Sequence, residues 1–367
     1  MTQTKDTSWQ VYTDSTLRDI QSILEQQNIS LDTHQPHVLG ERFLMQAVTT
    51  TSGRKVILLG IETTTGKKVV IKATNDPAGK AELKQEQHCR QLLHSLPFAY
   101  NRFHSPAEIL FLEKNNYLIS VQEFITQTSS FIQRPLADQF AFALQALKDQ
   151  ELARATTAKH IASIAQTFGN RSSIEYLRLF AGFVDVLQNK KVGAKTLAAV
   201  KEAQVRLTQQ AQRIEQYCGF LTHTDFVPHN FRIKDQTLYL LDFSSLKFGN
   251  KHESWARFLN FMTLYNRELE TLLITYVEKN RSSEERESLQ LMRLFRLGEI
   301  ITYYTSLLEK STDALHELNT LRVQLWTDVL TAELTNTRVS TNVIETYRTQ
   351  RDALRSPEEK TRQIGLH

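Results

Sequence analysis

Residues 223–243 read HTDFVPHNFRIKDQTLYLLDF, and this stretch joins polar, chemically capable side chains to two apolar runs. The runs 231–234 and 238–241 are separated by three polar residues, which predicts a β-hairpin with arms of similar length. Because the ends of a hairpin meet, Asn230 before the first arm and Asp242 after the second should lie on neighbouring strands about 4.8 Å apart. An amide and a carboxylate placed in this way predict a Mg²⁺ site, since the ion needs few protein ligands.

Asp225 precedes Asn230 by five residues, in a loop that residues 226–228 (FVP) make apolar and rigid. A carboxylate held in one direction there can accept the proton of a substrate hydroxyl. Phosphoryl transfer requires mainly alignment and neutralisation of charge, so this carboxylate and a metal clamp would be the minimum equipment for it. We assign His223 to the same catalytic loop, where we expect it to support the loop by hydrogen bonding more than to transfer a proton.

The order of these residues carries a family resemblance. H-x-D-x-x-x-x-N, a hairpin and then D-F beginning at Asp242 resembles the order in protein kinases and in aminoglycoside and choline phosphotransferases. HTDFVPHN is similar to the HGDxxPxN form of the small-molecule branch. The resemblance implies that Asp225 is the catalytic base and that Asn230 and Asp242 hold the metal. Two residues depart from the family pattern: Thr224 replaces the Gly of HGD, and Ser244 is third in the DFG-like triplet.

The N-terminal half contains a second matching motif. Lys72 ends the run VVIK, which resembles the β3 motif V-A-I-K, whose ammonium group contacts the α- and β-phosphates of the nucleotide. The next predicted helix carries Glu82 and Glu86 four residues apart on one face, so either could pair with Lys72. We expect Glu86 to be the partner, because it lies a turn deeper in the helix and nearer to the family's usual spacing.

Two further segments occupy nucleotide-contacting positions of the resembled fold. The loop TTTSG at residues 49–53 lies between the first two strands, where kinases cover the phosphates, and the end of the fifth strand corresponds to the hinge that offers backbone groups to adenine. The candidate contacts are Ser52, Gly53, Gln122, Glu123 and Phe124. The resemblance runs from roughly residue 40 to 260 and implies ATP or GTP with Mg²⁺ as cofactors.

The chain as a whole predicts an α+β protein with the two lobes of a protein-kinase-like fold: a small antiparallel sheet with one helix, then a large helical lobe. The predicted strands and helices before the lobe boundary are a helix at 17–27, strands at 43–48, 56–62 and 69–74, a helix at 81–96, and strands at 107–112 and 117–124. Helices are predicted near 137–149, 157–168, 173–188, 194–217, 253–279, 282–309, 313–335 and 340–354.

These elements divide into four expected parts. They are an N-terminal helical extension at 1–36, a nucleotide-binding N-lobe at 37–125, a helical C-lobe at 126–355 that holds the catalytic loop and metal-binding hairpin at 223–245, and a frayed tail at 356–367.

Composition excludes several other classes of protein. The 44 basic and 40 acidic residues are scattered, so nucleic-acid binding is not expected. No apolar stretch has the length of a membrane span, and the first residues lack the core of a signal peptide. Cys89 and Cys218 are far apart and form no metal-binding or disulfide pattern, which indicates a reducing, cytoplasmic location.

The resemblance therefore implies a kinase that moves the γ-phosphate of ATP to a hydroxyl of a small molecule, such as an aminoglycoside, a choline-like amino alcohol, a sugar or a nucleoside. The helices within 126–217 and 253–335 are expected to line its pocket. Acidic side chains gathered there would indicate a cationic acceptor.

Two alternatives stay open at this stage. A pseudokinase would keep the fold and bind nucleotide without turnover, and Thr224 and Ser244 are the residues in its favour. A non-haem iron or hydrolytic enzyme would use a facial metal triad, but it would leave Lys72 without a role. The residues of that triad would be His223, Asp225 and His229.

Overall fold

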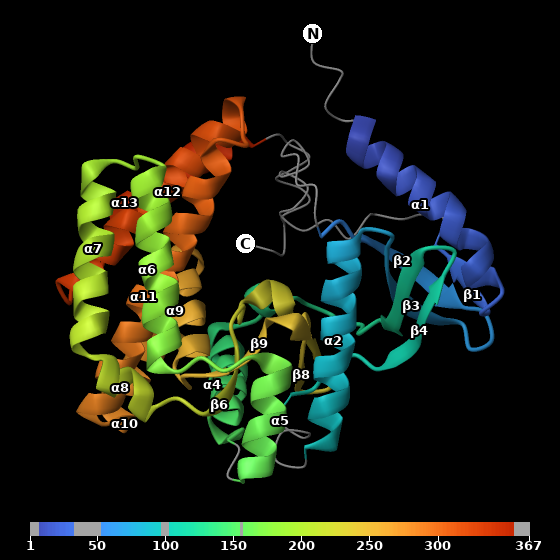
Figure 1. Ribbon diagram of the computed structural model, residues 1–367, viewed down its shortest axis with the longest axis horizontal. Helices are drawn as coiled ribbons and strands as arrows, with labels where there is room; N and C mark the ends of the chain where they lie inside the picture. The colour runs from blue at the N-terminus through green and yellow to red at the C-terminus, as the bar shows by residue number, and fades with distance from the viewer. Residues whose placement is uncertain (1–6, 33–52, 97–102, 155–156, 356–367) are drawn as a thin grey trace. The chain divides into compact units, whose positions relative to one another are not determined.

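The computed structural model describes residues 7–32, 53–96, 103–154 and 157–355 (Figure 1). The chain forms two compact units, which we call the sheet unit and the helical unit. The sheet unit comprises Met1–Gln91, His104–Thr128 and Arg232–Ser244, and the helical unit comprises Leu92–Phe103, Ser129–Phe231 and Ser245–His367. The predicted strand at 43–48 lies outside the described residues.

The sheet unit contains a five-stranded antiparallel sheet in the order β1-β2-β3-β5-β4. Its strands are β1 Ile29–Leu31, β2 Val56–Glu62, β3 Lys67–Thr74, β4 Glu108–Lys114 and β5 Tyr117–Glu123, and its helices are α1 Thr7–Glu25 and α2 Pro77–Ser95. β7 Phe231–Lys234 and β8 Thr237–Leu240 form a separate two-stranded sheet. The predicted hairpin is thus confirmed, while β1 was not foreseen.

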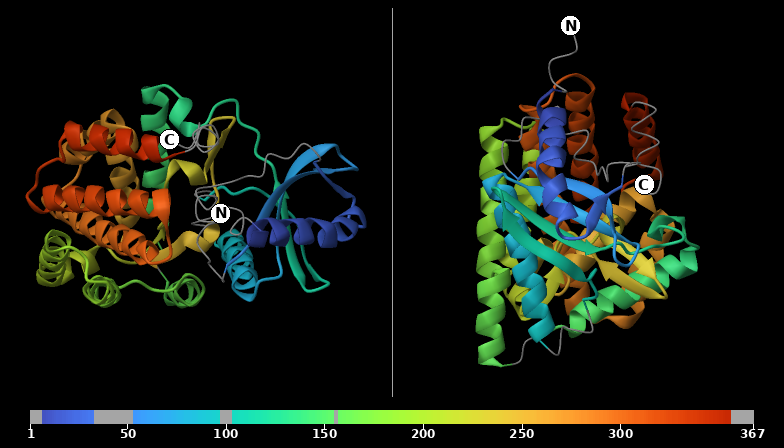
Figure 2. Two further views of the ribbon diagram at one scale, coloured as in Figure 1. Left: turned by 90° about the horizontal axis from the view of Figure 1, so that it is seen from above. Right: turned by 90° about the vertical axis from the view of Figure 1, so that its right-hand side faces the viewer.

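Helix α1 completes the core of the sheet. Alternate residues of β3, such as Val69 and Ile71, are fully buried, as expected for a strand with one covered face. Ile20 and Leu24 of α1 belong to the same buried cluster, and Figure 2 shows α1 lying along the sheet. The N-terminal helix is therefore part of the sheet unit's core. Burying a side chain such as Leu24 stabilises a fold by about 1.5–3 kcal/mol.

The helical unit is built mainly from helices, and together with the antiparallel sheet it confirms the predicted α+β class. Its helices are α4 Leu136–Leu152, α5 Ala158–Phe168, α6 Ser173–Asn189, α7 Ala194–Gln209, α8 Ala211–Gln216, α9 Glu253–Tyr265, α10 Arg267–Asn280, α11 Ser283–Leu308, α12 Asp313–Leu334 and α13 Thr341–Leu354. Its strands β6 Phe220–His223 and β9 Leu246–Gly249, which the sequence analysis missed, pair antiparallel. Within the described residues, no helix is both long and apolar enough to cross a bilayer.

Two long predicted helices are each broken in the structure. The segment predicted as one helix at 194–217 is interrupted at Gln210, whose φ of −109° and ψ of 24° leave the helical region. The prediction at 253–279 fails at Asn266, which has φ −151° and whose side chain accepts a hydrogen bond from Leu269 N. Asn is a favoured N-cap residue, so it starts a new helix where apolar periodicity alone indicated a continuous one.

Helix α11 packs against α6, α9 and α12, and Gly298 allows it to approach α6 closely. A Cβ at Gly298 would overlap the ring of Phe180, whereas a Cβ at the helical residue Gly182 would meet nothing within 4 Å. We expect Gly298→Ala to lower the free energy of unfolding by about 1–3 kcal/mol through overpacking. Gly182→Ala should instead raise it by up to about 1 kcal/mol through helix propensity. Denaturant melts of both variants check the prediction, and stabilisation of both would contradict it.

Candidate active site

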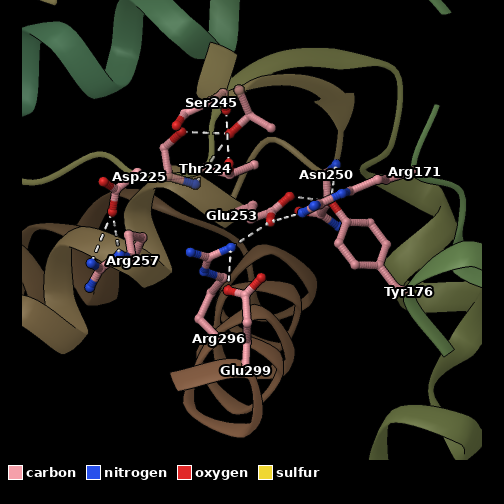
Figure 3. A network of polar contacts seen from close by, with 12 residues as sticks. Arg171, Tyr176, Thr224, Asp225, Ser245, Asn250, Glu253, Arg257, Arg296 and Glu299 are labelled. Carbon is pink, nitrogen blue, oxygen red and sulfur yellow. Dashed lines mark hydrogen bonds and ion pairs between the residues drawn. The ribbon is translucent and has the colours of Figure 1, made fainter. Parts of the chain in front are cut away.

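The predicted catalytic loop begins where β6 ends. His223, its last residue, pairs with Leu246 of β9. Next to it, the backbone N–H and the hydroxyl of Thr224 both donate to the carbonyl of Ser245, over 2.9 and 2.8 Å, as Figure 3 shows. The hydroxyl contact is one that Gly could not make. Thr224 therefore ties the loop to the segment after the hairpin.

His223 is fully buried. Its backbone N–H donates to Gln150 Oε1 at 2.9 Å and to Ser254 Oγ at 3.0 Å, and the Ser254 hydroxyl in turn lies 3.1 Å from the His223 carbonyl. The imidazole ring packs edge-on against Phe226, with 6.5 Å between ring centroids. This placement suits the supporting role expected of His223. Gln150 and Ser254, which bind its backbone, were not predicted from the sequence.

Asp225 is held from two sides. Its Oδ1 accepts from Nε and Nη2 of Arg257, over 3.1 and 2.9 Å, and its Oδ2 accepts from the side-chain amide of Asn230 at 3.0 Å. Burial would raise the pKa of Asp225, but its ion pair with Arg257, helped by Arg296, outweighs burial and lowers the pKa to about 2. The side chain keeps 40 % exposure, so Asp225 is an ionised, oriented and accessible carboxylate.

Arg257 was not singled out from the sequence. It lies on α9 within the run SWARFLNFM, where it is the one charged side chain in a mostly apolar stretch. A charge on a buried helix face requires a partner, and that requirement is the signal that would have drawn attention to it. The identity of the partner, Asp225, follows only from the tertiary fold, because the two residues are 32 positions apart.

A cluster of aromatic rings fixes the direction of the loop. Phe226, directly after the candidate base, lies 4.6 Å from Phe231 and 5.6 Å from Phe258 between ring centroids, and Phe131 meets Phe231 edge-on at 5.4 Å. All four side chains are buried. Aromatic pairs of this kind add about 0.5–1.5 kcal/mol beyond the burial of their area. Apolar residues were expected to orient the loop, and in the structure Phe226 packs within this cluster.

The two candidate metal ligands are hard oxygen donors. The amide nitrogen of Asn230 is used on the backbone carbonyl and the carboxylate of Asp225, at 2.9 and 3.0 Å, which leaves its carbonyl oxygen for a ligand. Asp242 follows β8 with φ of 58°, and the Ser244 hydroxyl donates to its Oδ1 at 2.5 Å. Amide and carboxylate oxygens suit Mg²⁺, so both residues fit the ion chemically. Their binding of Mg²⁺ stays a prediction.

The hairpin between these residues has a tight turn. Asp235 and Gln236 have φ of 48° and 64°, and positive φ at both central residues defines a type I′ turn. Its twist matches that of the flanking strands β7 and β8, so a two-residue loop closes the hairpin.

Lys72 on β3 is paired with Glu86 on α2 in the sheet unit. The ammonium nitrogen lies 2.7 Å from each carboxylate oxygen of Glu86, and Arg90 Nη2 lies 3.0 Å from one of them. Burial would raise the pKa of Glu86, but Lys72 and Arg90 outweigh it and lower the pKa to about 2. Glu82 pairs instead with Lys55, at 2.5 Å. The expected choice of Glu86 as the partner of Lys72 is confirmed.

The lowered pKa of Glu86 predicts a loss of stability in acid. The ionised carboxylate stabilises the fold fully above its ordinary pKa of 4.5, and this contribution disappears as the pH falls towards 2. We therefore expect the wild-type chain to exceed Glu86→Gln in free energy of unfolding by about 3 kcal/mol at pH 7, with the difference shrinking below pH 4.5. Urea melts from pH 7 to pH 3 measure it, and a difference that grows in acid would contradict the assignment.

Of the predicted phosphate-covering loop at 49–53, the described residues include only Gly53. Ser52 lies outside the described residues. Gly53 has φ of 75°, and its N–H donates to Asp76 Oδ1 at 3.0 Å. The same oxygen accepts from the N–H of Gly79 at 2.9 Å and so caps the start of α2. A Cβ at Gly53 would lie 2.9 Å from Glu82 Oε1, so both backbone angle and space favour glycine here. Its contact with phosphate stays a prediction.

The hinge candidates occupy different environments. The side chain of Gln122 is buried and its amide lies 3.4 Å from Glu86 Oε1, so it faces the Lys72 pair. The backbone N–H groups of Glu123 and Phe124 donate to the carbonyls of Ala107 and Lys68, over 2.9 and 3.3 Å. These two N–H groups are engaged inside the sheet unit. A contact of this segment with adenine would therefore use carbonyl groups or the N–H of a later residue.

The facial-triad alternative is contradicted. Among the described residues, which include all three of its candidates, no three His, Cys, Asp or Glu side chains come together in a group that could hold a metal ion. The carboxylate of Asp225 is turned towards Arg257 instead.

The antiparallel sheet with its Lys72–Glu86 pair, and the helical unit with its HTDFVPHN loop, define a chain of the protein-kinase-like fold class. No protein-family model matches the sequence, and no curated protein matches it. Solved structures do match it. A thermostable mutant of aminoglycoside phosphotransferase APH(4)-Ia, in ternary complex with AMP-PNP and hygromycin B, gives a TM-score of 0.58 at 11 % identity, over 86 % of this chain and 98 % of that chain.

Two other similar structures support the same fold. Macrolide 2'-phosphotransferase type I gives a TM-score of 0.54 at 14 % identity, over 85 % of this chain and 97 % of that chain. ADP-bound aminoglycoside phosphotransferase APH(2'')-Ib gives 0.53 at 12 %, over 84 % and 96 %. The chain thus has the fold of the aminoglycoside and macrolide phosphotransferases, which confirms the resemblance drawn from the sequence.

Proposed function

We propose that this chain is an ATP-dependent phosphotransferase that moves the γ-phosphate to a hydroxyl group of a small molecule. The observation that carries the proposal is the Lys72–Glu86 pair, with 2.7 Å between the ammonium nitrogen and each carboxylate oxygen. A buried carboxylate that fixes an ammonium on the third kinase-like strand is the arrangement that positions the α- and β-phosphates of a nucleotide. The fold shared with phosphotransferases adds support.

In the proposed reaction, the acceptor oxygen attacks the γ-phosphorus, the bond from that phosphorus to the β–γ bridging oxygen breaks, and ADP leaves. Asp225 orients the hydroxyl and accepts its proton, which then passes to solvent. The Arg257 and Asn230 contacts hold the carboxylate for this task. Because the transition state is loose, alignment matters more than the basicity of Asp225, and its low pKa does not oppose the role.

We further propose that Asn230 Oδ1 and the Asp242 carboxylate hold Mg²⁺, which when bound would neutralise phosphate charge. Lys72 and Glu86 would position the nucleotide, and Ser52, Gly53 and the segment around Gln122, Glu123 and Phe124 remain its further candidate contacts. The thiols of Cys89 and Cys218 are unbridged, which accords with the cytoplasmic location included in the proposal.

The pseudokinase is the alternative to this proposal. Thr224 and Ser244, its two supporting residues, make the loop contacts to Ser245 and Asp242. The two functions differ in one measurable way, since a pseudokinase would bind ATP without forming ADP.

The test is ADP formation by the full chain with MgATP and a panel of hydroxylated compounds, which includes aminoglycosides, amino alcohols, sugars and nucleosides. AMP-PNP binding is measured alongside. We expect AMP-PNP to bind with a Kd in the micromolar to millimolar range, and at least one acceptor to raise ADP formation about tenfold over the acceptor-free rate. Absence of nucleotide binding would remove the proposal, and binding with no acceptor-dependent ADP would favour the pseudokinase.

A further inference from the structure

The carboxylates that surround the candidate base are committed to arginines. Besides Asp225, the network in Figure 3 contains the fully buried Glu253 and the partly exposed Glu299. Their ion pairs are Asp225 with Arg257 at 2.9 Å, Glu253 with Arg171 at 2.5 Å and with Arg296 at 3.3 Å, and Glu299 with Arg296 at 2.6 Å. Tyr176 also donates to Glu253, at 2.6 Å. Each of these three carboxylates therefore already has a cationic partner.

Arg257 has donor capacity beyond its contact with Asp225. Its Nε and Nη2 both donate to the same oxygen, Oδ1 of Asp225, over 3.1 and 2.9 Å. Among the hydrogen bonds of the described residues, Nη1 takes part in none, and the side chain keeps 20 % exposure. A guanidinium group has five donors in a rigid fork that matches carboxylate and phosphate oxygens. Arg257 can therefore hold Asp225 and contact a second oxyanion.

A fourth guanidinium lies beyond Arg257. Tyr304 of α11 acts electrostatically on Arg257, and the guanidinium carbon of Arg322, on α12, lies 4.8 Å from the centroid of the Tyr304 ring. Among the described residues of the helical unit, Arg257 is thus accompanied by the guanidinium groups of Arg171, Arg296 and Arg322. Since Arg171 and Arg296 are paired with Glu253 and Glu299, the group that distinguishes acceptors is Nη1 of Arg257, a cationic donor that would repel a polycationic acceptor and attract an oxyanion.

Resting on the proposed phosphotransferase function, we propose that the acceptor is a hydroxylated small molecule that carries an oxyanion, and that Arg257 binds this group through Nη1 while it positions Asp225. The shared chemistry of the acceptor is a carboxylate or a phosphate ester. Because one guanidinium contacts both groups, binding of the oxyanion would bring a hydroxyl of the same molecule to Asp225. The inference excludes aminoglycosides as preferred acceptors, although the similar structures include enzymes named for them.

The native chain tests this with acceptors that share a skeleton and differ in charge. One series is gluconate, sorbitol and glucamine, and a second is glycerate, glycerol and serinol. Sorbitol 6-phosphate and glycerol 3-phosphate, which have a phosphate and no carboxylate, separate the two kinds of oxyanion. Kanamycin represents polycations. Within each series the acidic member should have the highest kcat/KM, by about tenfold or more over the neutral one. A higher kcat/KM for the neutral or cationic members would overturn the inference and leave the kinase proposal standing.

A second measurement does not depend on turnover. The Tm of the full chain is recorded with each compound in wild type, Arg257→Gln and Arg257→Lys, with Arg178→Gln as a matched loss of one charge at an exposed site on α6. Acidic compounds should raise the Tm of wild type and Arg178→Gln, less that of Arg257→Lys, and not that of Arg257→Gln. Equal shifts in all four chains, or no shift in wild type, would overturn the inference.

The two measurements also separate the proposals. Tm shifts that require Arg257, without any ADP formation, would support the oxyanion site and count against the kinase. ADP formation at a rate that does not depend on the charge of the acceptor would support the kinase and count against the oxyanion site. In Arg257→Lys, a raised KM for the acidic acceptor with kcat lowered less would show binding of the oxyanion, whereas a purely structural role would lower the Tm and leave the ratio between acidic and neutral acceptors unchanged.

Discussion

Asp225→Asn is expected to lower kcat by about 100- to 10,000-fold, because the amide can neither accept the hydroxyl proton nor orient the acceptor as an anion does. The affinity for AMP-PNP should stay within about threefold of wild type, since Asp225 lies in the helical unit's loop and has no proposed contact with nucleotide. Single-turnover ADP formation with the best acceptor from the panel, and calorimetric binding of AMP-PNP, measure the two quantities.

The control for this variant is Asp185→Asn, which changes the same functional group at an exposed position of α6. Its kcat should equal that of wild type. Asp225→Asn leaves Arg257 with a neutral partner, so its Tm is compared as well, and a folded variant is required before kcat is interpreted. Undiminished turnover in a folded Asp225→Asn chain would remove this residue from the mechanism.

The parts of the site that the sequence predicted are those with a local signature. The β7–β8 hairpin follows from two short apolar runs around a polar turn, and the register of such a hairpin is fixed by its loop. The pairing of Lys72 with Glu86 follows from a strand and a helix that are adjacent in the chain. In both cases the residues lie within some 15 positions, so periodicity and spacing suffice to bring them together.

The parts that the sequence did not predict depend on contacts between distant segments. Arg257 reaches Asp225 from α9, and Ser254 and Gln150 bind the backbone of His223 from two different helices. The sequence pattern of α9 does not identify these partners. A buried polar side chain requires a hydrogen-bond partner, but the local sequence does not determine which residue supplies it. The strands β6 and β9 were missed for the same reason, since each has only four residues and is stabilised by its partner.

The helix boundaries show the limit of apolar periodicity. Both sides of Asn266 continue the apolar pattern of α9 and α10, yet the chain breaks there because the Asn side chain caps α10. Arg293 of α11 binds a residue on each side of this break, Asn260 of α9 at 2.9 Å and Glu270 of α10 at 3.2 Å. A cap residue inside an apolar run is therefore a better boundary signal than periodicity alone.

Lys72→Met is expected to lower kcat/KM for ATP by about 100-fold or more, because it removes the ammonium that the sheet unit fixes for the phosphates. The variant should remain folded, since Glu86 keeps its contact with Arg90 at 3.0 Å. Glu86→Gln should lower kcat/KM for ATP by about tenfold or more, because Lys72 then loses the carboxylate that holds it at 2.7 Å and its ammonium is no longer positioned.

The same helix supplies the matched control. Glu82 lies one turn before Glu86 on α2, but its carboxylate is 42 % exposed and binds Lys55, so Glu82→Gln should change kcat/KM for ATP by no more than about twofold. The four chains are compared by steady-state kinetics at saturating acceptor with ATP varied. If Glu82→Gln and Glu86→Gln lowered kcat/KM for ATP equally, the Glu86 carboxylate would act only through the general charge of α2. The Lys72–Glu86 ion pair would then have no specific role in the proposed mechanism. A large loss of kcat/KM for ATP in the Lys72 and Glu86 variants alone would instead show that catalysis with ATP depends on this ion pair.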